Sequence, residues 1–176
     1  MSTMTEQERL LESRRRRIAR GAADEGRRAA ALHEYALIHG GGMVFAVRGA
    51  DAVAMLNEVI VERIPGLPPE IPGAVVWKRQ SFACIDPFQL AGFKATRPQT
   101  ALLLGSCRAG QIALGGERIE IAARPADQEL DPAPPHAAWR AWTRGRDANG
   151  CWHIDAQALT EFVSGLPCFA DRQGAG

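Results

Sequence analysis

The sequence predicts an α+β fold with a long N-terminal helical arm, a central and mostly antiparallel sheet of four to five strands carrying one helix, and a small C-terminal helix–strand–helix module. Three observations carry this prediction. The first forty residues are rich in Glu, Arg, Leu and Ala and contain no proline, which is typical of helix. Short apolar runs bounded by glycine and proline follow, which are typical of strands. Strands and helices do not alternate regularly, which favours α+β over a doubly wound sheet.

The arm is expected to span residues 1–40, with helix over 4–38. A heptad-like apolar stripe runs along it, and such a stripe is typical of a helix that packs against another helix. The stripe consists of Leu11, Ile18, Ala22, Ala29, Leu32 and Ala36. The three glycines at 40–42 are expected to end the helix, because glycine is the residue most common just after a helix C-terminus.

The core domain is expected over residues 41–123. Apolar runs predict strands at 43–47, 74–84 and 100–104, and a helical pattern predicts the one helix at 50–64. Four prolines make 65–73 a stiff, extended connector. The clearest hairpin signal joins 111–114 to 117–122 through Gly115 and Gly116.

The rest of the chain is expected to form a proline-rich linker at 124–135, a tryptophan-containing tail module at 136–168 and a disordered tail at 169–176. In the module we expect a helix carrying Trp139 and Trp142 on one face, a short strand at 151–154, and a helix capped by Asp155. The segment 150–162 resembles the last strand and helix of excisionase-type DNA-binding modules. The preceding helix–turn–helix is not evident, so no family is assigned.

The composition limits the partners. With 176 residues, 46% of them hydrophobic, the chain can bury one full core. Its net charge of +1 gives no global attraction to nucleic acid or membrane, so such a partner must meet a local patch. The apolar stretches are far shorter than the ~18–20 residues of a bilayer span, and no apolar signal region follows the N-terminal charges. We expect a cytoplasmic protein with reduced cysteines and no membrane association.

No catalytic motif is complete. His39 and the glycines after it resemble the oxyanion-hole segment of lipases and esterases, but the matching Gly-x-Ser-x-Gly is absent, so a turn is the preferred interpretation. Cys107 beside Arg108 is more typical of a buried small residue than of a nucleophile. Cys151 and His153 form a single pair and no Cys-x-x-Cys occurs, so no metal site is predicted. No phosphate-binding loop is present, and neither a cofactor nor a catalytic residue is assigned.

The N-terminal arginines give the main functional hypothesis. Arginine forms good contacts with phosphates, and four consecutive residues sweep most of a helical turn, so they cannot all serve one intramolecular face. The predicted nucleic-acid-binding residues are Arg14, Arg15, Arg16, Arg17 and Arg20. A solvated helix surface, balanced by neighbouring carboxylates, is the simpler interpretation of the same run.

The leading hypothesis is therefore a non-enzymatic accessory or regulatory protein that associates with DNA or RNA. The alternative is an oligomeric interaction or scaffold protein whose N-terminal segment pairs with another copy or with a protein partner. An enzyme with an unrecognised active site comes third.

Overall fold

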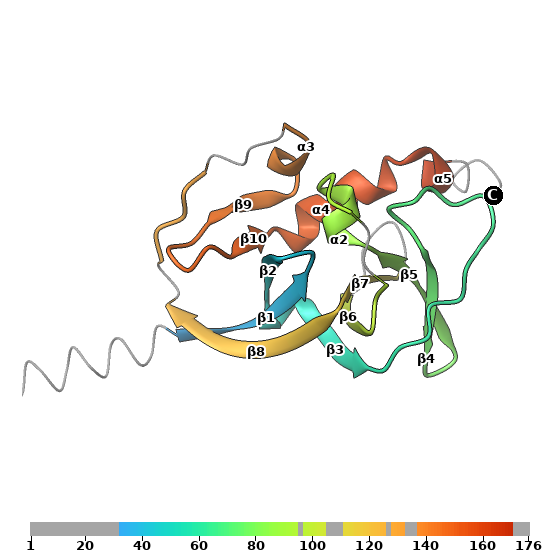
Figure 1. Ribbon diagram of the computed structural model, residues 1–176, viewed down its shortest axis with the longest axis horizontal. Helices are drawn as coiled ribbons and strands as arrows, with labels where there is room; N and C mark the ends of the chain where they lie inside the picture. The colour runs from blue at the N-terminus through green and yellow to red at the C-terminus, as the bar shows by residue number, and fades with distance from the viewer. Residues whose placement is uncertain (1–31, 95–96, 105–110, 126–127, 133–136, 171–176) are drawn as a thin grey trace, which may run out of the picture.

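A computed structural model describes residues 32–94, 97–104, 111–125, 128–132 and 137–170. In these residues the chain forms two five-stranded β-sheets, with short helices beside them (Figure 1). The expected α+β architecture with a single central sheet is wrong. In the described ranges, no helix combines the length and hydropathy that crossing a membrane requires.

Sheet A has the strand order β8-β1-β2-β10-β9. Its strands are β1 (Leu32–Gly40), β2 (Met43–Arg48), β8 (Arg118–Pro125), β9 (Thr143–Arg146) and β10 (Trp152–Ile154). β1 pairs antiparallel with both β2 and β8, whereas β10 joins β2 in parallel. The turn from β1 to β2 contains Gly41 and Gly42 at φ +55° and +78°. These backbone angles suit glycine, so the glycines at 40–42 close a hairpin and do not end a helix.

The helix expected over residues 4–38 is wrong from residue 32 onward, because residues 32–40 form β1. Tyr35 to Ile38 are all buried, since one side of β1 faces the second sheet and the other lies under a separate apolar cluster. Pairing on both edges and burial on both faces override the helical propensity of these residues. Residues 1–31, with the five arginines predicted to bind nucleic acid, lie outside the described ranges.

Sheet B has the strand order β3-β6-β7-β5-β4. Its strands are β3 (Ala52–Asn57), β4 (Gly73–Trp77), β5 (Gln80–Ile85), β6 (Thr100–Leu104) and β7 (Ile112–Gly116). The helix expected at 50–64 is wrong: one short turn, η1 (Gly49–Asp51), precedes β3, whose residues alternate between half-buried and exposed. The single strand expected at 74–84 is a hairpin, which turns at Lys78 and Arg79.

The hairpin expected at 111–122 is also wrong, because β7 belongs to sheet B and β8 to sheet A. Gly116 allows the sheets to approach each other closely, and Gly115 leaves room for Pro98. A Cβ on Gly116 would lie 2.5 Å from Cγ2 of Ile38 in β1, and one on Gly115 would lie 2.9 Å from Pro98. Gly116 therefore lies where the chain crosses between the sheets, and a side chain there would clash with Ile38.

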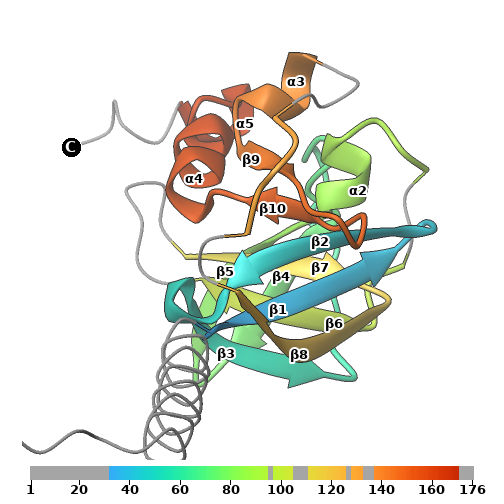
Figure 2. The same ribbon diagram turned by 90° about the vertical axis from the view of Figure 1, so that its left-hand side faces the viewer.

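The main apolar cluster lies between the sheets and draws on both of them, with Ile38 and Phe45 from sheet A and Leu102 from sheet B. A second cluster belongs to sheet B, around Phe82 and Leu103. A third covers the other face of sheet A, around Tyr35, Leu37 and Cys151. The helices are α2 (Pro87–Leu90), α3 (Ala137–Arg140), α4 (Ala156–Ser164) and α5 (Pro167–Ala170). The last three gather at one end of the molecule (Figure 2).

The C-terminal helix–strand–helix module is wrong as a separate unit. β9 and β10 are part of sheet A, and the rings of Trp139 and Trp142 are buried in the main cluster between the sheets. The helix capped by Asp155 is confirmed as α4, where the carboxylate accepts a hydrogen bond from the Ala158 N–H at 3.1 Å. The domain boundaries at residues 41, 124, 136 and 169 stay a prediction.

Candidate protein-docking groove

A groove of about 1030 Å³ opens beside the chain that connects β3 to β4. Its walls are residues 59–72, the start of α2, and Arg97 with Pro98 just before β6. The proline-rich connector expected at 65–73 therefore becomes one wall of a surface groove.

The connecting chain is held in place by backbone hydrogen bonds. The Val59 N–H donates to Gln99 at 3.0 Å, and Glu62 exchanges two hydrogen bonds with Ala74 of β4 at 2.8 and 2.9 Å. Farther along, the Ile71 N–H donates to Pro68 at 2.9 Å. Prolines fix φ in this stretch and lower its conformational freedom. The groove is therefore largely formed before any ligand binds.

The lining is mainly apolar. It comprises Val59, Ile60, Val61, Ile64, Pro65, Leu67, Pro68, Pro69, Ile71, Pro72 and Pro98, with Arg63, Asp86, Gln89 and Arg97. Ile60 is 80% exposed and Ile64 47% exposed, whereas Ile71 at the base is buried. Large apolar side chains held this far out on an anchored loop are typical of a surface that another molecule covers.

The groove has two exposed positive charges and one buried negative charge. Arg63 and Arg97 are exposed at its walls. Asp86 is buried and already caps α2, accepting hydrogen bonds from the N–H groups of Phe88 at 2.9 Å and Gln89 at 3.1 Å. The groove therefore offers apolar contact together with two cations.

The groove has few groups suited to chemistry. No serine, cysteine or histidine occurs among the described residues that line it. In the neighbouring strand β5, burial and then the charge of Asp86 raise the pKa of the Cys84 thiol to about 12. A thiol with such a pKa stays protonated and is a poor nucleophile. The arrangement is suited to binding.

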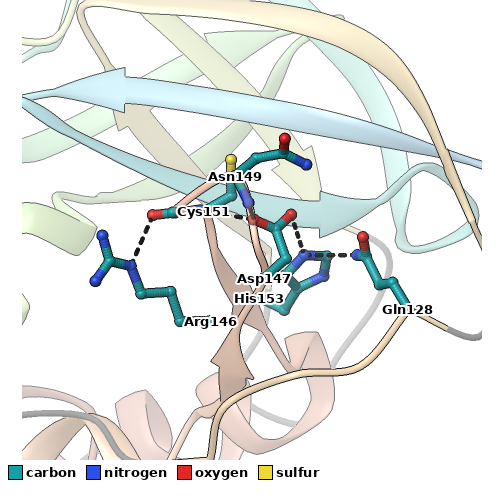
Figure 3. Close-up of polar contacts among 7 residues, drawn as sticks. Gln128, Arg146, Asp147, Asn149, Cys151 and His153 are labelled. Carbon is teal, nitrogen blue, oxygen red and sulfur yellow. Dashed lines mark hydrogen bonds and ion pairs between the residues drawn. The ribbon is translucent and has the colours of Figure 1, made fainter.

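A second group of polar side chains surrounds His153 of β10, a strand of sheet A (Figure 3). The Nε2 atom of His153 lies 3.1 Å from Oδ2 of Asp147 and 2.8 Å from the Gln128 amide. Oδ1 of Asp147 accepts from the N–H groups of Asn149 and Cys151, each at 2.9 Å. Because a carboxylate only accepts, the neutral ring holds its proton on Nε2 for Asp147, and the Gln128 NH2 group cannot donate to the same nitrogen at the same time.

The pKa shifts agree with a structural role for this cluster. Burial lowers the pKa of His153, and this outweighs the opposite effect of Asp147. Burial alone would raise the pKa of Asp147, but the Cys151 N–H, His153 and the Asn149 N–H together hold it below its ordinary value. The cluster is a buried carboxylate beside a neutral imidazole, and it ties the 147–151 turn to β10 of sheet A.

Of the residues singled out in the sequence, Cys151 and His153 both contact Asp147 in the cluster just described. Arg14 to Arg17, Arg20 and Cys107 lie outside the described ranges, and nucleic-acid binding at these arginines stays a prediction. His39 lies at the end of β1, 3.1 Å from Glu120 of β8, in a surface ion-pair cluster. In the part of the chain that the structure describes, no group of His, Cys, Asp or Glu is arranged to hold a metal ion.

The sequence pattern did not show that Ile60 and Ile64 lie at the surface. The helix expected at 50–64 is not formed: the chain leaves β3 at Asn57 and bends at Glu58, where φ is +55°. The β-branched run Val59, Ile60, Val61 directly before a proline cluster was the available signal, since such a run disfavours helix.

The arrangement of the two sheets is found in a solved structure. The chain is similar to the scaffolding protein TtCheW from Thermoanaerobacter tengcongensis, whose crystal structure aligns with a TM-score of 0.60 at 15% sequence identity. The alignment covers 72% of this chain and 91% of that chain. At this identity the likeness establishes a CheW-like fold. No family model and no curated protein matches the sequence.

Proposed function

We propose that the chain is a non-enzymatic scaffold module that binds a partner protein in the 59–72 groove. The observation that carries the proposal is the 80% exposure of Ile60 in a groove with an apolar lining. The likeness to a scaffolding protein supports the same class of function. This is the alternative hypothesis of the sequence analysis, and no feature of the described residues favours the nucleic-acid hypothesis.

The groove indicates the chemistry of the partner. Ile60 and Ile64 fit apolar side chains, and Arg63 with Arg97 fit carboxylates beside them. We infer a partner segment that combines apolar and acidic residues. Because the groove wall is anchored and rich in proline, binding orders few residues of this chain, which lowers the entropic cost of association.

Site-specific photocrosslinking in the native cell tests the proposal. A photoreactive amino acid at position 60 should form one dominant protein adduct, identified by mass spectrometry. Position 76 is the matched control, because Val76 of β4 is 53% exposed but does not line the groove. Equal adducts at both positions, or none at position 60, would refute the proposal.

Ile64→Asp, combined with the photoreactive residue at position 60, measures the energetic contribution of the groove. Fully burying an exposed isoleucine is worth about 1.5–3 kcal/mol, and Ile64 is already half buried, so loss of this contact should weaken binding by roughly three- to tenfold. The adduct should fall accordingly, while the unfolding midpoint of the free protein stays near that of the parent. An undiminished adduct would place the partner elsewhere.

The nucleic-acid hypothesis gives a separate result. If Arg14 to Arg17 contact phosphates, affinity for a DNA duplex should fall with salt at a log–log slope of about −3.6 for four contacts. Replacing all four by glutamine should remove most of that slope. If the chain is only a protein scaffold, no salt-dependent duplex binding of this size is expected from fluorescence anisotropy.

A further inference from the structure

The two sheets have four edge strands, and three of these are protected against pairing with a strand of another molecule. Unpaired N–H and C=O groups on an edge invite another strand, so edges are normally charged or covered. β8 carries Arg118, Glu120 and Arg124. β9 is covered where Arg146 exchanges two hydrogen bonds with Asp131, at 2.8 and 2.9 Å. β4 is covered in the same way by Glu62 at Ala74.

The fourth edge, β3, has neither protection. Its sequence from Ala52 to Asn57 contains no charged residue and no proline. β6 lies on its inner side, and no described segment pairs with its outer side. It is the lowest of the strands in Figure 2. The pairing with β6 is irregular between Ala52 and Ala54 and regular from Ala54 onward.

The outward side chains of β3 are apolar as well. Val53 is 56% exposed and Met55 is 38% exposed, whereas Ala54 and Leu56 pack against the apolar cluster of sheet B. An exposed, uncharged edge with apolar outward residues can receive another strand of similar character by main-chain pairing.

We propose that the outer edge of β3 pairs antiparallel with β3 of a second copy of this chain. The pairing joins sheet B of one protomer to sheet B of the other across a two-fold axis. A second copy fits this edge because it brings a strand that is itself uncharged and apolar on its outward face. The contact is isologous, so it closes at a dimer and does not propagate.

The charges around β3 agree with a register centred on Met55. Met55 then faces the partner's Met55, and Val53 faces the partner's Asn57. The nearest charged residues, Asp51 and Glu58, face the partner's Val59 and the partner's Ala52. No charge lies directly opposite a like charge, although Glu58 lies one position from the partner's Asp51 at each end of the contact.

Sedimentation over a concentration series tests the dimer. A short strand contact is a small interface, so the series should reach roughly 0.5 mM to detect weak association. Met55→Lys places on the edge the residue that commonly protects edges, and should raise the dimer dissociation constant at least about tenfold. Val76→Lys, on β4 at 53% exposure, is the control and should leave the dissociation constant unchanged.

Hydrogen exchange on the unmodified chain gives a readout that does not depend on a variant folding. Exchange of the amides at 54–57 should slow as concentration rises through the dimer transition, while the amides of β4 stay constant. Three results overturn the proposal: a monomer throughout the series, a Met55→Lys dimer as tight as the parent, or a dimer without added protection in β3. No residue of β3 itself lines the proposed groove, although the register places Val59, at one end of the groove, opposite the partner's Asp51.

Discussion

Trp139 and Trp142 are both buried between the sheets, yet their indole N–H groups differ. The Trp139 Nε1–H donates to the carbonyl oxygen of Ala91 at 2.7 Å. The Trp142 Nε1–H has no hydrogen-bond acceptor among the described residues. Buried polar groups are usually paired, so the two rings contribute differently although each is almost fully enclosed.

Phenylalanine at each position should separate these contributions. Both substitutions remove a similar volume, but Trp139→Phe also leaves the buried Ala91 carbonyl unpaired, at a cost of about 1–3 kcal/mol. We expect Trp139→Phe to lower the free energy of unfolding by that much more than Trp142→Phe. Urea unfolding of the two variants measures the difference. Equal losses would mean that the Ala91 hydrogen bond contributes nothing net.

His153 should make the protein less stable in mild acid. Its pKa is lowered from 6.5 in the folded protein, mainly by burial, so below about pH 6.5 the unfolded chain binds more protons than the folded one. Stability then falls as pH decreases, by at most about 1.4 kcal/mol per pH unit. The lowered pKa of Asp147 acts in the same direction, but only below its ordinary value of 3.8. The range from pH 7 to 5 therefore isolates the histidine.

His153→Gln should flatten the dependence of the urea midpoint on pH between 7 and 5, because glutamine can still donate to Asp147 but does not titrate. His33→Gln, at an exposed position of β1, is the control and should retain the parent profile. A parent protein whose stability does not change over this range would contradict the prediction.

At the scale of elements, the β4–β5 turn stores strain. Lys78 and Arg79 have φ of +47° and +65°, a region that costs residues other than glycine about 1–2 kcal/mol each. The Lys78 ammonium lies 4.3 Å from the centre of the Trp77 ring, which offsets part of this cost at position 78. No such contact of Arg79 is seen among the described residues.

Arg79→Gly should therefore stabilise the protein by about 0.5–1 kcal/mol, since the relief of strain exceeds the added freedom of the unfolded chain. Gln80→Gly, one residue later in β5, should instead destabilise it, because glycine weakens a regular strand. The melting temperatures of the two variants test both predictions. A lower melting temperature for Arg79→Gly would show that its side chain makes a contact worth more than the strain.

Some elements could be predicted from local sequence, and others could not. β2, β6 and α4 follow from short apolar runs and from the Asp155 cap, which are local signals. β1 was taken for helix because its burial on both faces hides the alternation that identifies a strand. β7 and β8 were taken for a hairpin because nothing in Gly115 and Gly116 shows that the chain changes sheet there.

The candidate site was predictable only in part. Four prolines indicate an extended connector, which the structure places at the groove wall. Whether Ile60 points into a core or into solvent depends on the backbone bend at Glu58 and on the hydrogen bonds of Glu62 with β4. Such long-range pairing leaves no periodic signal in a single sequence.

At the scale of the whole molecule, the chain passes from sheet A to sheet B after β2 and returns after β7. The main apolar cluster therefore contains residues from both sheets and from α4. We expect the described part of the chain to unfold in a single transition, with far-ultraviolet circular dichroism and tryptophan fluorescence giving the same midpoint. Two separated midpoints would show that the sheets unfold independently.

Gly116→Ala tests how closely the sheets must approach at the return crossing. The added methyl group would lie 2.5 Å from Cγ2 of Ile38, which is fully buried. Overpacking of this kind costs about 1–3 kcal/mol, so the urea midpoint should fall while the transition stays single. Gly165→Ala is the control, because its nearest contact is an ordinary 3.4 Å, and it should be neutral or slightly stabilising. An unchanged midpoint for Gly116→Ala would mean that the sheets can separate at this point without loss, and that the crossing does not couple them.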